Sequence, residues 1–172
     1  ELSPAACALA DRTAAANGLT DRLITLPCDL RDRRQLPSAG RFDLAVSNPP
    51  YFPAGGGKTA AGSRGIHRAE LACTMEQLCA AAAYLLRSGG QFCLVYRTER
   101  LAELLETLRR HRLEPKALRF VQKNAASAPS LLLMACRKDG GTGLTVQPPL
   151  LLQNDDGTET PELRRIYFKE KG

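Results

Sequence analysis

The sequence predicts an α/β domain with a mostly parallel sheet and an antiparallel hairpin near its C-terminal edge. Short apolar runs alternate along the chain with longer segments that carry helix caps and helical spacing. The chain has 172 residues, of which 44% are hydrophobic, and this is enough for one domain with a real core. No apolar run approaches the ~18 residues of a membrane span, so we expect no membrane partner.

The first half of the chain is expected to contain one helix and two strands. Ser3 suits the N-cap of a helix and Gly18 its C-terminal end, which predicts a helix over Ala5–Asn17. The apolar runs Leu23–Leu26 and Phe42–Ser47 have the length and composition of buried strands.

The second half is expected to contain two helices, a strand and a hairpin. A capping box of Thr74 and Gln77 begins a helix that continues to Arg87. The elements expected after it are a strand over Gln91–Tyr96, a helix from Thr98 to Arg112, and a hairpin of Ala117–Val121 with Leu131–Cys136. Residues 1–138 then form the domain, and residues 139–172 form a tail that docks on it.

Asn48-Pro49-Pro50-Tyr51 directly follow the strand predicted over Phe42–Ser47. Two consecutive prolines cannot continue a ladder or a helix, so the strand ends there in a rigid turn. The turn holds Asn48 and Tyr51 at the C-terminal end of a strand, where open α/β folds bind their ligands. The plainer alternative is a rigid turn with a buried tyrosine.

These residues suit methyl transfer to an exocyclic amine or an amide nitrogen. Such a nitrogen is a poor nucleophile because its lone pair is delocalised into the ring or carbonyl. The side-chain oxygen of Asn48 and the carbonyl of Pro49 can each accept one N–H bond and turn the lone pair toward a methyl donor. Tyr51 offers a flat face on which an extruded base can stack, and Phe52 either extends that face or belongs to the core.

The motif resembles that of the class I S-adenosylmethionine-dependent amino methyltransferases. The stretches that begin at His67, Gly90 and Leu113 are similar to those of bacterial tRNA adenine-N6-methyltransferases. This resemblance implies a Rossmann-like fold, S-adenosylmethionine as the cofactor, and the N6 amine of an adenine in tRNA as the methyl acceptor.

The same resemblance implies which residues bind the cofactor. Glu1 and Leu2 match the end of the family's second strand, whose acidic residue holds the cofactor ribose. Asp29 and Leu30 match the end of the third strand, which faces the cofactor adenine, and Asn48 is implied to contact the cofactor as well. From the residues alone, Asp29 has a simpler alternative role as the cap of a short helix that follows it.

The family's glycine-rich first motif would precede Glu1, and the chain does not contain it. We therefore expect a fragment of a longer protein whose sheet lacks its first strand. An unpaired strand edge would favour association with a second copy, and the chain by itself would bind the cofactor poorly and be inactive.

The segment from Phe52 to Cys73 has no hydrophobic period, so we expect a mobile loop. Its polar side chains are candidate contacts for substrate phosphates, with a merely solvated loop as an equal alternative. The candidates are Lys58, Arg64, His67 and Arg68.

Cysteine usage and charge place broad limits on the chain. The six cysteines include no Cys-x-x-Cys pair and only two histidines accompany them, so we expect reduced thiols in a cytoplasmic protein and no metal site. The net charge of +6 and the pI near 9.2 agree with a polyanionic partner.

Two other functions remain open at this point. Glutamine methylation on a protein would use the same motif equally well, whereas guanine N2 fits the stretches beyond the motif less well. A non-catalytic domain that holds RNA or another partner is compatible with the missing cofactor motif.

Overall fold

The computed structural model describes residues 1–49 and 73–168. The chain divides into two compact units, Glu1–Ser38 and Ala39–Gly172. Within the described residues, no helix is long and apolar enough to span a bilayer.

The first unit contains helix α1 (Pro4–Ala16) and the 3-10 helix η1 (Arg33–Gln35). Helix α1 begins as predicted, because the Ser3 hydroxyl oxygen accepts the N–H of Ala6. After α1 the chain reverses through Gly18, whose φ of +65° is accessible to a residue without a side chain.

The strand predicted over Leu23–Leu26 is wrong. The segment is not a strand, and Ile24 within it is 77% exposed. Two backbone bonds join its end to Glu1: the Glu1 N–H donates to the Leu26 carbonyl (3.0 Å), and the Cys28 N–H donates to the Glu1 carbonyl (3.1 Å). This is the bonding pattern of a parallel ladder, but one bridging residue is too short to make a strand.

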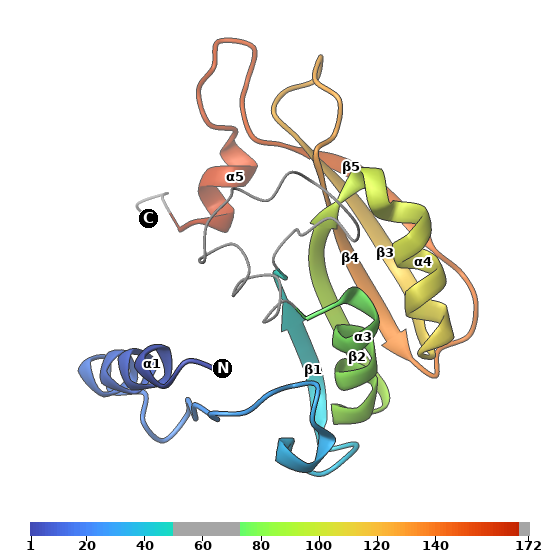
Figure 1. The fold of residues 1–172 in the computed structure, drawn as a ribbon. Coiled ribbons are helices and arrows are strands. Elements are labelled where there is room, and N and C mark those ends of the chain that lie inside the picture. The colour runs from blue at the N-terminus through green and yellow to red at the C-terminus, as the bar shows by residue number, and fades with distance from the viewer. Residues whose placement is uncertain (50–72, 169–172) are drawn as a thin grey trace, which may run out of the picture. The chain divides into compact units, whose positions relative to one another are not determined.

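The second unit is built on a five-stranded mixed sheet, shown in Figure 1, with the order β1-β2-β4-β3-β5. The strands are β1 (Phe42–Ser47), β2 (Leu86–Arg97), β3 (Leu113–Gln122), β4 (Leu131–Lys138) and β5 (Thr145–Leu151). β1 is parallel to β2 and β5 is parallel to β3, whereas β4 runs antiparallel between β2 and β3. The predicted α/β class and the predicted hairpin are confirmed.

Helices α3 (Met75–Leu85) and α4 (Leu101–Arg110) lie on one face of this sheet (Figure 1). Their buried residues pack against alternate residues of the central strands, which form the core together with them. The largest side chains that are almost fully buried there are Phe92, Leu86, Leu104, Leu108, Leu113, Leu132 and Met134.

The predicted capping box is present at the start of α3: Thr74 and Gln77 exchange bonds between side chain and backbone. The predicted end of this helix is wrong, because α3 ends at Leu85 and β2 begins at Leu86. Gly89 and Gly90 therefore lie inside a strand; at Gly90 a Cβ atom would come within 2.9 Å of the Arg87 carbonyl oxygen.

The predicted cap at Thr98 is also wrong. Thr98 begins the 3-10 helix η2 (Thr98–Arg100), and its hydroxyl donates to the Pro129 carbonyl at 2.9 Å. The next helix, α4, begins three residues later at Leu101.

The segment after Gly140 contains a strand that the sequence did not reveal. β5 includes Pro148 and Pro149, and two prolines argue against a central strand. The sheet accommodates them because β5 lies at its outer edge. Helix α5 (Pro161–Ile166) follows β5, and the side chain of Thr160 caps it by accepting the Leu163 N–H at 3.2 Å.

Candidate functional site

Asn48 and Pro49 directly follow the C-terminal end of β1, as the sequence predicts. The parallel register of β1 with β2 continues to the pair Ser47 and Leu94, so the two strands point the same way as the chain leaves the sheet. Asn48 is exposed and Pro49 is half-buried. The Asn48 side chain is therefore accessible at the edge where parallel strands present ligand-binding residues.

The remaining residues of the predicted motif and loop lie outside the described residues. They are Pro50, Tyr51, Phe52, Lys58, Arg64, His67 and Arg68.

In the first unit, the two predicted cofactor carboxylates lie on segments that the backbone brings together. The two main-chain bonds of Glu1 to Leu26 and Cys28 place it beside the residues that precede Asp29. Glu1 also accepts the Ser3 N–H on its side-chain oxygen at 2.8 Å, and this bond lowers the pKa of the exposed carboxyl group. Leu2 is 44% exposed and Leu30 is partly buried.

Asp29 is held by Arg31, a residue that the sequence gave no reason to select. The Arg31 guanidinium donates to both Asp29 carboxylate oxygens, with its terminal nitrogen 2.6 Å from Oδ2. The hydrogen bond from Arg31 lowers the pKa of Asp29. The one signal for this contact in the sequence is a basic residue two positions after the acidic residue. The alternative role of Asp29 as a helix cap is wrong, because Asp32 caps η1.

These residues fit the adenosine part of S-adenosylmethionine. Ribose hydroxyls and an exocyclic amine are hydrogen-bond donors, and an ionised carboxylate is a strong acceptor for them. Glu1 and Asp29 are such acceptors, since local N–H donors lower the pKa of both. The donor set of the cofactor and the acceptor set of this unit therefore match in chemistry.

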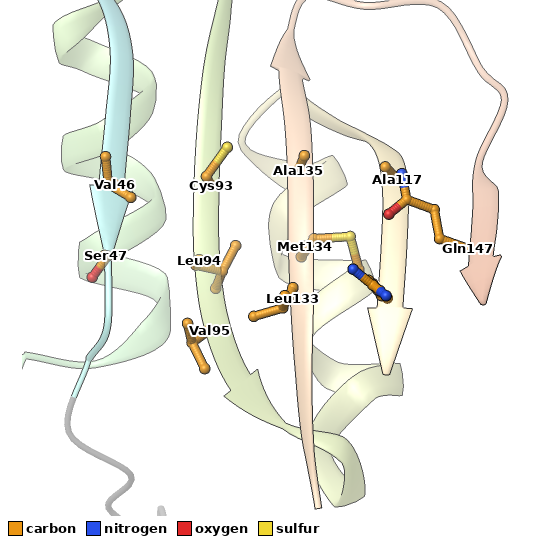
Figure 2. Close-up of a pocket in the computed structure, with 11 residues that line it drawn as sticks. Val46, Ser47, Cys93, Leu94, Val95, Ala117, Leu133, Met134, Ala135 and Gln147 are labelled. Carbon is orange, nitrogen blue, oxygen red and sulfur yellow. The ribbon is translucent and has the colours of Figure 1, made fainter. Parts of the chain in front are cut away.

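The second unit carries an apolar groove of about 370 Å³ on the sheet face that faces away from α3 and α4. Figure 2 shows that side chains from all five strands line it, with Val46 and Ser47 at the β1 end and Gln147 at the β5 end. Among the described residues that line it, the one charged side chain is that of Arg119, which pairs with Glu162 of α5 at 2.7 Å. The lining thus suits packing against another apolar surface and offers no acid–base pair.

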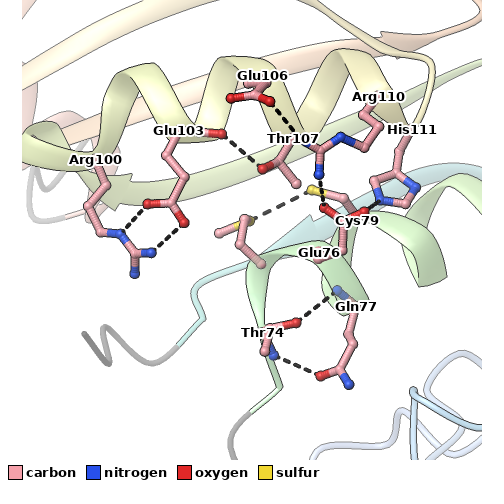
Figure 3. A network of polar contacts seen from close by, with 11 residues as sticks. Thr74, Glu76, Gln77, Cys79, Arg100, Glu103, Glu106, Thr107, Arg110 and His111 are labelled. Carbon is pink, nitrogen blue, oxygen red and sulfur yellow. Dashed lines mark hydrogen bonds and ion pairs between the residues drawn. The ribbon is translucent and has the colours of Figure 1, made fainter. Parts of the chain in front are cut away.

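A polar network joins α3 to α4 (Figure 3). Glu76, in the first turn of α3, lies 2.8 Å from His111 Nε2 and 3.1 Å from Arg110. Arg110 also pairs with Glu106 one turn earlier in α4 (2.6 Å). Its members lie on α3 and α4 or, for His111, at the C-cap of α4, so we interpret the network as a structural link.

All six cysteines lie within the described residues, and all six are free thiols. Burial raises the pKa of Cys79 to about 12 and raises that of Cys136 as well, so neither forms a thiolate at neutral pH. Among the described residues, no group of three histidine, cysteine or acidic side chains could hold a metal ion.

Curated relatives are similar to this sequence over most of its length. A tRNA1(Val) (adenine(37)-N6)-methyltransferase of Porphyromonas gingivalis is 29% identical over 171 residues, which cover 96% of this chain and 66% of the relative. The enzymes of the same name in Dickeya chrysanthemi and Serratia proteamaculans are 28% and 33% identical, over 91% and 74% of this chain and 62% and 48% of their own. The chain therefore spans about two thirds of these relatives or less. The predicted resemblance to this family is confirmed.

No protein-family model matches the sequence. Among solved structures, a predicted O-methyltransferase from Agrobacterium tumefaciens superposes with a TM-score of 0.77 over 96% of this chain and 74% of its own, at 18% identity. Geranyl diphosphate methyltransferase in complex with S-adenosylmethionine superposes with a TM-score of 0.51 over 80% of this chain and 66% of its own, at 14% identity. These likenesses confirm the Rossmann-like methyltransferase fold.

Proposed function

We propose that this chain, whose relatives are bacterial tRNA1(Val) adenine-N6-methyltransferases, carries the acceptor-orienting residues of an S-adenosylmethionine-dependent enzyme that methylates the N6 amine of an adenine in tRNA. The observation that carries the proposal is the position of Asn48, exposed directly beyond the C-terminal end of the parallel strand β1. Net charge supports a polyanionic substrate, since the chain carries 24 basic and 18 acidic residues.

In this proposal the chain's own residues orient the target amine. Asn48 accepts one N–H of the amine on its side-chain oxygen, and the Pro49 carbonyl accepts the other. The two bonds turn the nitrogen lone pair toward the methyl group that bound S-adenosylmethionine supplies, and they favour the positive charge that develops on nitrogen. Pro50 restricts the turn, and Tyr51 stacks on the base, with Phe52 beside it.

Glu1 and Asp29, with Leu2 and Leu30 beside them, bind the cofactor ribose and adenine in this proposal. The ionised carboxylates of Glu1 and Asp29 support it. Residues 139–172 are the C-terminal segment that docks on the domain in this proposal, and the pairing of β5 with β3 supports it. The thiols and the tRNA substrate together favour the cytoplasm as the location.

The test is methyl transfer from labelled S-adenosylmethionine by the full-length protein to bulk tRNA that lacks the modification and, separately, to release-factor protein. Label recovered as N6-methyladenosine supports the proposal. Label on protein glutamine would replace RNA by protein as the substrate while keeping the role of Asn48. Bound cofactor with label on neither substrate would favour the non-catalytic alternative.

Two variants sharpen this test. Asn48→Ala should reduce turnover by about 100-fold or more while cofactor binding stays unchanged, because it removes one acceptor from the transition state. The double variant Arg64→Ala with Arg68→Ala should weaken tRNA binding and flatten its salt dependence, since phosphate contacts release counterions. Unchanged tRNA affinity in the double variant would remove these two residues from the substrate site.

We further propose that residues 1–172 in isolation associate through β1 with a second copy. Within the described part of the chain, β1 ends the sheet and pairs with β2 alone, and Leu44 and Val46 on it are 51% and 73% exposed. An unpaired apolar edge strand is a template for strand addition. Light scattering after size exclusion should show a dimer, and a monomer at high concentration would reject the association.

A further inference from the structure

We propose that Arg31 is a positioning residue of the cofactor site, which holds the Asp29 carboxylate in the orientation that accepts an exocyclic amine. The inference rests on the proposed function, since it requires that Asp29 bind the cofactor adenine. It adds a residue that the resemblance to methyltransferases did not identify.

Four contacts fix the Asp29 carboxylate. Arg31 Nε lies 2.9 Å from both carboxylate oxygens, and a terminal nitrogen of Arg31 lies 2.6 Å from Oδ2. The Arg31 backbone N–H donates to Oδ1 at 2.9 Å. A planar guanidinium that bonds both oxygens sets the plane of the carboxylate as well as its position, which a single point charge cannot do.

The backbone of Asp29 is held too. Its N–H donates to Gln35 Oε1 at 3.0 Å, and the amide nitrogen of Gln35 donates to Asp32 at 3.2 Å. Side chain and main chain of Asp29 are thus both tied to residues within six positions of it. The acceptor is oriented before any ligand arrives, so binding does not have to order it.

The carboxylate still has room for one more donor. Two carboxylate oxygens offer about four acceptor positions, and among the described residues three donor groups of Arg31 use them: Nε, which both oxygens share, one terminal nitrogen and the backbone N–H. The Asp29 side chain is 22% exposed, so a ligand can reach it. An amine hydrogen fits the remaining position, whereas a carbonyl oxygen placed there would face the carboxylate and be repelled.

A matched control lies three residues further along the chain. Arg34 binds Asp32 with the same two-residue spacing, with Nε 3.0 Å from Oδ1 and a terminal nitrogen 2.9 Å from Oδ2. This pair lowers the pKa of Asp32 to about 2, much as Arg31 lowers the pKa of Asp29. Asp32 caps η1 through the Arg34 backbone N–H and accepts the Gln35 amide. Neither bond uses the Arg34 side chain, so Arg34→Ala should leave the binding of an adenine ligand unchanged.

The test compares two ligands by titration calorimetry on the full-length protein: S-adenosylhomocysteine, and S-inosylhomocysteine, which carries a carbonyl in place of the amine. The wild type should bind the adenosyl ligand more tightly. Arg31→Ala should weaken binding of the adenosyl ligand about fivefold and leave the inosyl ligand unchanged. Arg34→Ala should change neither affinity.

A second variant guards against a folding defect. Arg31→Lys keeps the charge and loses the bidentate geometry, so its affinity for the adenosyl ligand should lie between those of the wild type and Arg31→Ala. In an Asp29→Asn background, Arg31→Ala should have no further effect, because the arginine acts through the carboxylate.

The outcomes separate this inference from the proposed function. Equal losses for both ligands in Arg31→Ala would make Arg31 a general structural residue and overturn the inference, and so would an unchanged adenosyl affinity. Either result would leave the proposed function intact if the wild type binds the adenosyl ligand. A wild type that binds neither ligand would reject the cofactor site itself.

Discussion

Arg119 on β3 and Glu162 in the first turn of α5 form a bidentate ion pair, with nitrogen–oxygen distances of 2.7 and 2.8 Å. Arg119 Nε also donates to the Pro148 carbonyl of β5 at 2.9 Å. One guanidinium therefore joins an inner strand, the edge strand and the last described helix. A six-residue helix is too short to be stable by itself, so α5 depends on this attachment.

Replacing Glu162 by Gln should release α5 without unfolding the domain. The expected result is faster amide hydrogen exchange over residues 162–167 with a change in global stability below about 1 kcal/mol, since the pair is partly exposed. Asp155→Asn removes the same charge from the turn before α5 and should leave this exchange unchanged. Equal protection in Glu162→Gln and wild type would show that other contacts hold α5.

The same ion pair predicts a pH dependence. The hydrogen bond from Arg119 lowers the pKa of Glu162 from its ordinary value of 4.5. The stabilisation is therefore fully present above pH 4.5 and is lost as the pH falls through the lowered pKa. Hydrogen exchange of α5, followed as the pH is lowered and corrected for the intrinsic rate, should show the loss in wild type and a flat profile in Glu162→Gln.

The two faces of β2 should respond differently to truncation. Phe92 is 1% exposed and packs under α3 and α4, whereas Val95 lines the apolar groove on the opposite face. Phe92→Ala should lower the free energy of unfolding by about 3–5 kcal/mol, and Val95→Ala by about 1 kcal/mol. Urea denaturation measures both. Similar losses would mean that the groove face is as tightly packed as the core.

Gly90 should not tolerate a side chain. A Cβ atom there would lie 2.9 Å from the Arg87 carbonyl oxygen and 3.2 Å from the Phe42 carbonyl oxygen, both of them backbone atoms. Gly90→Ala should therefore destabilise the protein by about 1–3 kcal/mol as the strands move apart. Gly141→Ala is the matched control, because a Cβ atom there meets nothing within 4 Å. Thermal unfolding of the two variants should differ clearly in midpoint, and equal midpoints would contradict the close approach.

The link between α3 and α4 should depend on Glu76 more than on Glu106. Glu76 accepts bonds from Arg110 and His111 and also lies at the positive N-terminal end of α3, whereas Glu106 pairs with Arg110 within α4. Glu76→Ala should cost about 1 kcal/mol, and Glu106→Ala below about 0.5 kcal/mol. Chemical denaturation tests the difference, and the reverse order would show that the link between helices adds nothing.

Local chemistry in the sequence was enough to predict the elements whose determinants lie within a few residues. Three local features act through the neighbouring backbone: the Ser3 cap, the capping box of Thr74 with Gln77, and the prolines that follow Ser47. They made the start of α1, the start of α3 and the end of β1 predictable. The motif at Asn48 similarly predicted both its place beyond a strand and the chemistry we propose for it.

Contacts between segments that are far apart in the sequence determined the strands that these local rules missed. Residues 23–26 have a strand's composition, yet the described structure contains no strand there, and Glu1 makes ladder-type bonds to Leu26 and Cys28. Residues 145–151 contain two prolines, yet they form β5 because β3 offers a parallel edge. The insertion of β4 between β2 and β3 likewise follows from which segments meet in space. Strand pairing and ion pairing are properties of two segments, so one segment's residues do not specify them.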